Sequence, residues 1–105
     1  MEYDINKDLL PLGSVIQVRF NSDKFIIIGF YPKNTKDGKT YDYALVRYPE
    51  GLVDLDDSIV ANRDLVKRVI HMGYISEAEK KFKEDLQKEV EKEANKIDIL
   101  DFPSN

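Results

Sequence analysis

The residues of this chain that could take part in chemistry are few and stand apart from one another. His71 is the only histidine, and the 105-residue chain has no cysteine. Nucleophilic catalysis needs a nucleophile beside a base, and a zinc site needs several nitrogen or sulfur ligands at fixed spacing. The sequence offers His71 no such partner. We therefore interpret His71 as a strand residue with one face toward solvent, and we expect no catalytic residues.

Three aspartates, Asp54, Asp56 and Asp57, crowd one segment and raise the question of calcium binding. An EF-hand loop also needs a central glycine for its turn and a closing glutamate as a bidentate ligand. This segment has neither, so we interpret it as a solvated acidic loop. The glycines are scattered singly and form no phosphate-cradling loop. We expect no metal, no cofactor and no small-molecule substrate.

Tyrosines near turns are the feature that points to binding. Tyr41, Tyr43 and Tyr48 lie in one expected strand, and Glu50 follows in a turn of sequence Tyr-Pro-Glu-Gly. Tyrosine is enriched in protein interfaces because it brings a large apolar area with little rotamer entropy and a polar tip. These four residues are candidate protein-binding residues. The alternative is that the rings complete or rim a small core.

The elements that would position these residues are strands before residue 75. Short apolar segments rich in β-branched and aromatic residues alternate with turn residues, which indicates a small antiparallel sheet. A segment apolar on both faces, 25–28, predicts a central strand. We expect a β-meander or an SH3-like half-barrel of about five strands. The expected strands span residues 14–20, 24–31, 41–48, 59–60 and 67–74.

The pattern changes to that of a helix after Tyr74. Ser76 is a candidate N-cap, with Glu79 three residues later in a capping-box arrangement. Apolar residues then recur at helical spacing and draw a stripe along one face. The stripe consists of Ala78, Phe82, Leu86, Val90, Ala94 and Ile97.

We predict a helix over 76–97 whose stripe packs on the sheet or on a partner. A twenty-residue helix spans about 30 Å, more than the expected strands, so its far half can overhang the sheet. The candidate protein-binding residues of the helix are Phe82, Leu86, Val90 and Ile97. The fold class is α+β, and the length suits one domain. Its parts are an arm at 1–13, a sheet at 14–74, the helix at 76–97 and a tail at 98–105.

Charge and composition narrow the partners and the location. The net charge is −4, from 16 basic and 20 acidic residues, so the chain lacks the bulk positive charge that favours nucleic acid. The N-terminus is polar and acidic, and no long apolar stretch follows, so we expect no signal peptide and no membrane. The absence of cysteine suits a reducing compartment. We expect a cytoplasmic protein.

An ordered set of short motifs carries a resemblance to a known family. The motifs are Leu9-Leu10-Pro11-Leu12-Gly13-Ser14-Val15, Ile26-Ile27-Ile28-Gly29, Tyr41-Asp42-Tyr43, Tyr48-Pro49-Glu50-Gly51 and Gly73-Tyr74, followed by an acidic helix start with Phe82. Over about residues 9–83 the chain resembles a small Firmicute family catalogued as a domain of unknown function and found beside genes for LXG-type toxins of the type VII secretion system. The resemblance implies a cytosolic chaperone or targeting factor that binds the toxin, through its helical LXG domain, before export.

Three functional hypotheses follow. The first is a non-enzymatic accessory protein that binds a protein client. The second is a small β-barrel regulatory module that binds a peptide or nucleic acid, although its Lys and Arg residues are interleaved with acids rather than gathered in a groove. An enzyme is the third.

Overall fold

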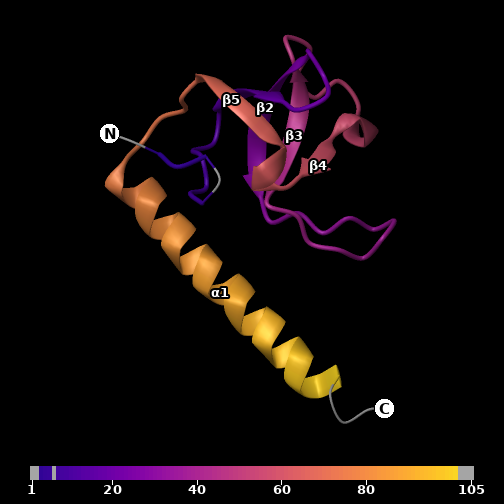
Figure 1. The fold of residues 1–105 in the computed structure, drawn as a ribbon, viewed down its shortest axis with the longest axis vertical. Helices are drawn as coiled ribbons and strands as arrows, with labels where there is room; N and C mark the ends of the chain where they lie inside the picture. Colours follow the sequence, from indigo (N-terminus) through magenta and orange to yellow (C-terminus); the bar gives the residue numbers. More distant parts are fainter. Residues whose placement is uncertain (1–2, 6, 102–105) are drawn as a thin grey trace. The chain divides into compact units, whose positions relative to one another are not determined.

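A computed structural model describes residues 3–5 and 7–101, apart from the side chains of Leu55 and 93–101. The chain divides into two compact units, Met1–Tyr74 and Ile75–Asn105. The first holds a five-stranded antiparallel sheet and the second holds one helix (Figure 1). The predicted α+β class is confirmed.

The sheet is an open meander with one returning strand. Its strands are β1 (Val15–Val18), β2 (Lys24–Phe30), β3 (Tyr43–Tyr48), β4 (Ile59–Ala61) and β5 (Val66–His71). They lie in the order β4-β3-β2-β1-β5, so the first four follow one another and the last returns to pair with the first. The sheet is not closed into a barrel, and the hypothesis of a module that binds a peptide or nucleic acid stays a prediction.

The core covers one face of this sheet. Side chains alternate between the two faces of a strand, and the core residues come from alternate positions of β1, β2 and β3, from one position each of β4 and β5, and from the N-terminal arm. Each such aliphatic or aromatic side chain contributes roughly 1.5–3 kcal/mol when fully buried. The core residues are Leu9, Leu10, Ile16, Val18, Phe25, Ile27, Tyr43, Leu45, Ala61 and Val66.

Several strand limits differ from the sequence-based expectation, and the first strand ends at Val18 rather than at residue 20. The third strand begins at Tyr43, because Tyr41 belongs to the preceding loop, where its N–H donates to Pro32 O at 2.9 Å. The last strand ends at His71, and the chain then leaves the sheet toward Gly73. The Gly73 N–H donates to Ser14 Oγ at 3.0 Å and ties the exit of β5 to the start of β1.

The helix α1 spans Glu77–Asp101. Ser76 caps it as predicted, since Ser76 Oγ accepts from the Glu79 N–H at 3.1 Å. The expected end at 97 is wrong, and 98–101 belong to the helix rather than to a tail. The first residue downstream that opposes a helix is Pro103, which disfavours helical backbone at the residue before it. The remainder of the expected tail, 102–105, lies outside the described residues.

Candidate protein-binding surface

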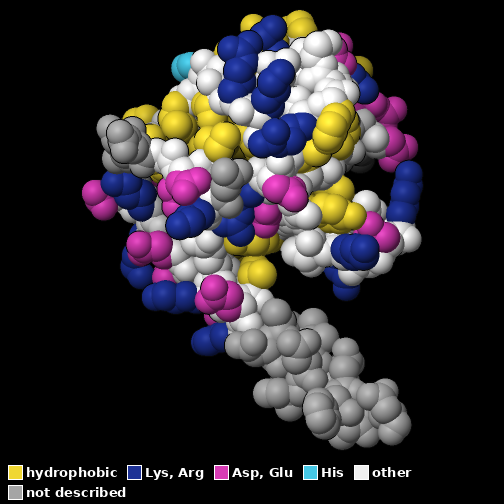
Figure 2. Space-filling model, viewed as in Figure 1, with side chains coloured by type: hydrophobic (Ala, Val, Ile, Leu, Met, Phe, Trp, Pro, Cys, Tyr) yellow, Lys and Arg dark blue, Asp and Glu magenta, His cyan; other side chains and the backbone are white. Residues whose placement is uncertain are grey.

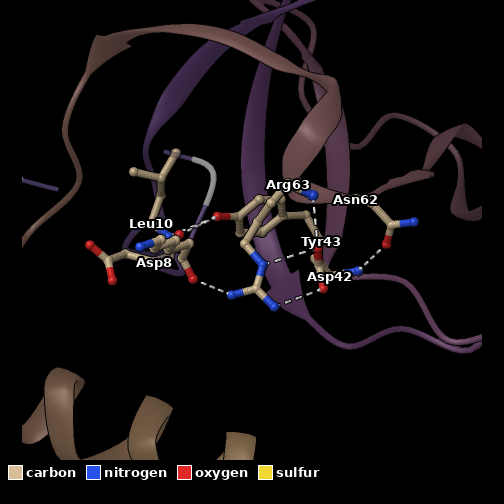
Figure 3. A network of polar contacts seen from close by, with 7 residues as sticks. Asp8, Leu10, Asp42, Tyr43, Asn62 and Arg63 are labelled. Carbon is tan, nitrogen blue, oxygen red and sulfur yellow. Dashed lines mark hydrogen bonds and ion pairs between the residues drawn. The ribbon is translucent and has the colours of Figure 1, made fainter. Parts of the chain in front are cut away.

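A partly buried polar network holds the N-terminal arm on the sheet (Figure 3). Arg63 binds Asp42 through its backbone N–H at 2.7 Å, its Nε at 3.1 Å and its Nη2 at 3.3 Å. Its Nη1 donates to the carbonyl of Lys7 in the arm. The backbone N–H of Asp42 donates to Asn62 Oδ1 at 3.1 Å. The pair therefore joins the arm, the start of β3 and the turn after β4.

Electrostatics support this pairing. Burial alone would lower the pKa of Arg63, but the hydrogen bonds and charge of Asp42 outweigh burial and raise the pKa. Paired and hydrogen-bonded in this way, the guanidinium meets the condition under which a partly buried charge is tolerated. The network is structural: it uses the donors and acceptors of Asp42 and Arg63 within the fold.

Tyr43 belongs to the same network and is fully buried. Its hydroxyl accepts from the Leu10 N–H at 2.8 Å and lies 3.4 Å from the Asp8 carbonyl. Burial raises the pKa of this phenol to about 12. Tyr43 is therefore a core residue that anchors the arm, and it drops out of the predicted contact surface.

The other predicted binding residues are distributed over both units. Tyr41 is partly buried, and its hydroxyl donates to Asp37 Oδ2 at 2.5 Å within the loop between β2 and β3. Tyr48 and Glu50 are exposed at the end of β3 and in the turn after it. In α1, Phe82 is exposed, whereas Leu86 and Val90 are partly exposed; the side chain of Ile97 lies outside the described residues. The sheet unit thus brings together only Tyr48 and Glu50.

Four exposed apolar side chains of the sheet unit lie near the ends of β1 and β3. We call Phe20, Tyr48, Leu52 and Val53 the apolar end; they are 97%, 49%, 50% and 76% exposed. β1 ends at Val18, and Lys24 at the start of β2 lies opposite Tyr48 at the end of β3. The segments 19–23 and 49–53 therefore leave the same end of the sheet.

Local contacts hold the segment 19–23 in place. Arg19 donates from its backbone N–H to Leu65 O at 2.9 Å and from its Nε to Asp64 O at 3.0 Å. Asp23 forms an ion pair of 2.7 Å with Arg47 of β3. Between these two anchors Phe20 has φ of 69°, in the left-handed region that a bulky side chain rarely adopts. The chain thus presents this ring to solvent from a fixed turn.

Sequence analysis missed Phe20, Leu52 and Val53. Alternation along the expected strand 14–20 predicts Phe20 on the same face as Ile16 and Val18, but the strand ends at Val18 and the chain turns before Phe20. A usable signal was the polar run Asn21-Ser22-Asp23 directly after the ring, because an aromatic residue at the edge of a turn need not continue the strand. Leu52 and Val53 carried no signal beyond their place in a loop.

The other candidate segments have structural roles. His71 is exposed on β5, as predicted. Asp54 caps a short 3₁₀ helix, Leu55–Asp57: its Oδ1 accepts from the Asp56 N–H at 3.1 Å, and Asp57 Oδ2 accepts from the Asp54 N–H at 3.0 Å. Two carboxylates of the acidic loop are thus engaged by the backbone. Within the part of the chain that the structure describes, no group of three His, Cys, Asp or Glu residues could hold a metal ion.

A pocket of about 720 Å³ adjoins the opposite end of β2 and β3. Its floor is apolar, with Ala44, Ile59 and Val60, and its rim carries Lys33, Lys36 and Asp56 among other residues of 32–36 and 56–60. The rim thus mixes both charges and selects no class of ligand.

Together, the fold and the apolar end define a small α+β protein with solvent-exposed hydrophobic side chains at one end of its sheet. The chain belongs to the family described as Domain of unknown function (DUF4176), whose model matches residues 9–82. The match covers the arm from Leu9, the whole sheet and the start of α1. No curated protein and no solved structure matches the chain significantly. Among the described residues, no helix is both long and apolar enough to cross a membrane.

Proposed function

We propose that this protein is a binding protein rather than an enzyme, and that its apolar end contacts a protein client. The observation that carries the proposal is Phe20, whose ring is 97% exposed on a backbone in the left-handed region. The exposed ring gains no burial energy, and its backbone conformation costs on the order of 1 kcal/mol. Tyr48, Leu52 and Val53 are exposed at the same end of the sheet, and exposed apolar side chains mark interaction sites where a partner covers them together.

The proposed client is the helical LXG domain of a type VII secretion toxin, which the protein would chaperone or target in the cytoplasm before export. The ordered motifs from Leu9 to Phe82 support this choice, because they resemble a family found beside LXG toxin genes. A helical client suits an apolar surface, since an amphipathic helix binds by laying its apolar stripe on such a patch. In α1, the exposed Phe82, with Leu86 and Val90, is a second candidate contact.

The test is co-expression of the full chain with the LXG domain of a neighbouring toxin, followed by calorimetric measurement of Kd. Phe20→Asn and Leu52→Ser should each weaken binding at least about tenfold, the loss expected of a hot-spot side chain. Asn tolerates the left-handed backbone, so the first variant should fold at least as stably as the wild type.

Leu12 provides the matched control. It is 48% exposed, close to the 50% of Leu52, but it precedes β1 and so lies at the other end of that strand from Phe20. Leu12→Ser should leave Kd within about twofold of the wild type. Equal effects of Leu12→Ser and Leu52→Ser, or an LXG domain that never binds the wild-type chain, would overturn the proposal.

A further inference from the structure

A row of side chains crosses four strands on the sheet face opposite the core. Gln17 of β1 pairs with Lys24 of β2 and with Arg68 of β5, and Lys24 pairs with Tyr48 of β3. Arg68 Nε donates to Gln17 Oε1 at 2.8 Å, which places both side chains on one face. The row therefore runs from Arg68 through Gln17 and Lys24 to Tyr48, which is itself a residue of the apolar end.

Two residues of this row, Lys24 and Arg68, carry a positive charge that a partner could pair with. Among the described residues neither Lys24 nor Arg68 forms an ion pair, whereas Arg47 is neutralised by Asp23. Both cations are exposed. Figure 2 shows Lys and Arg side chains gathered over the upper end of the sheet unit beside exposed hydrophobic ones.

The strand face next to the apolar end is therefore cationic. Lys24 lies opposite Tyr48, and Arg68 continues the row beyond Gln17. Potentials at specific interfaces are complementary, and like charges brought together cost several kcal/mol. This face therefore favours a partner that carries acidic residues.

We infer that the partner segment is an amphipathic helix whose apolar stripe covers the apolar end and whose Asp and Glu residues, along one flank, face Lys24 and Arg68. This inference rests on the proposed function and adds the chemistry of the client. The two cations steer the helix to the surface, and Phe20 and its neighbours supply the hydrophobic contact.

Two synthetic peptides test the inference without the toxin. Both are amphipathic helices with the same leucine stripe; one carries Glu along one flank and the other carries Lys at the same positions. Titration into the full ¹⁵N-labelled chain at low salt should show the Glu peptide binding at least about tenfold more tightly. The shifted amides should map to 19–24, 48–53 and Arg68, and the preference should shrink as added salt screens the charges.

Charge-reversal variants of the protein test the roles of Lys24 and Arg68. Lys24→Glu combined with Arg68→Glu should abolish or invert the preference, whereas Lys36→Glu, an exposed cation in the loop at the opposite end of β2, should retain it. Equal affinity for the two peptides, shifts that map elsewhere, or shifts that depend on protein concentration alone and so report self-association would overturn the inference. Failure of the LXG domain to bind while the Glu peptide binds as described would contradict the proposed client and leave the charge selectivity standing.

Discussion

Phe20 and Tyr43 show how two aromatic residues of one small sheet take opposite roles. Tyr43 points into the core, where its hydroxyl meets the Leu10 N–H at 2.8 Å. Phe20 follows the end of β1 and lies wholly in solvent. The difference lies in backbone position, because a side chain is buried only where its strand continues and faces the core.

The buried phenol makes stability depend on alkaline pH. The pKa of Tyr43 is raised from 10.0 to about 12 in the folded chain. The unfolded state therefore ionises first, so stability is unchanged by this group below pH 10 and falls as pH rises toward 12. The expected loss is about 2 kcal/mol, measured as a fall in the denaturation midpoint between these pH values.

Tyr43→Phe is the control for that measurement. It removes the titrating group, so the part of the alkaline loss due to Tyr43 should disappear. The variant should start less stable by about 1–3 kcal/mol, because the buried Leu10 N–H loses its acceptor. An alkaline loss of the same size in both proteins would contradict the role given to Tyr43.

At the scale of elements, two segments of backbone approach each other very closely at Gly73. A Cβ placed on Gly73 would lie 2.0 Å from the Leu12 carbonyl oxygen and 3.0 Å from the Ser14 N. Both atoms are backbone, so the clash cannot be relieved by a side-chain rotation. The segment after β5 therefore packs directly on the entry to β1.

Gly73→Ala should destabilise the sheet by about 3 kcal/mol or more, the range expected of severe overpacking. Gly29→Ala is the matched control, because its Cβ would meet only Ala44 Cβ at 3.6 Å, an ordinary contact. Chemical denaturation of both variants checks the prediction. A Gly73→Ala protein as stable as Gly29→Ala would show that the two segments can separate without cost.

At the scale of the molecule, the hydrophobic core of the described residues lies before Tyr74. Its buried members run from Leu9 to Val66, and the partly buried residues packed against them end at Met72. The expectation of one domain over 1–105 stays a prediction, because the chain forms two compact units. A test of whether the sheet unit folds without α1 decides between one domain and two.

A chain ending at Tyr74 should keep the circular dichroism of a β-sheet and a cooperative thermal transition. Its Tm should fall by less than about 8 °C, equivalent to roughly 1 kcal/mol for a domain of this size. An unfolded or non-cooperative truncated chain would show that α1 is required for the core, as a single-domain protein demands.

The sequence predicted the fold better than it predicted the binding surface. Alternation in β1, β2 and β3 and the Ser76 cap depend on near neighbours, so they are readable along the chain. Tyr43 and Tyr48 were placed on one surface, yet an odd separation within a strand puts them on opposite faces. The exposure of Phe20 depends on where β1 stops, and the partners of Arg63 depend on distant segments.

The return of β5 to pair with β1 has a consequence for biosynthesis. Val18 pairs with Val66, and Val15 pairs with His71, although the three other strands lie between them along the chain. Such non-local pairing slows folding. During translation, one edge of β1 stays unpaired until β5 has emerged from the ribosome. At that stage a chaperone or a neighbouring chain can bind the edge that β5 later covers.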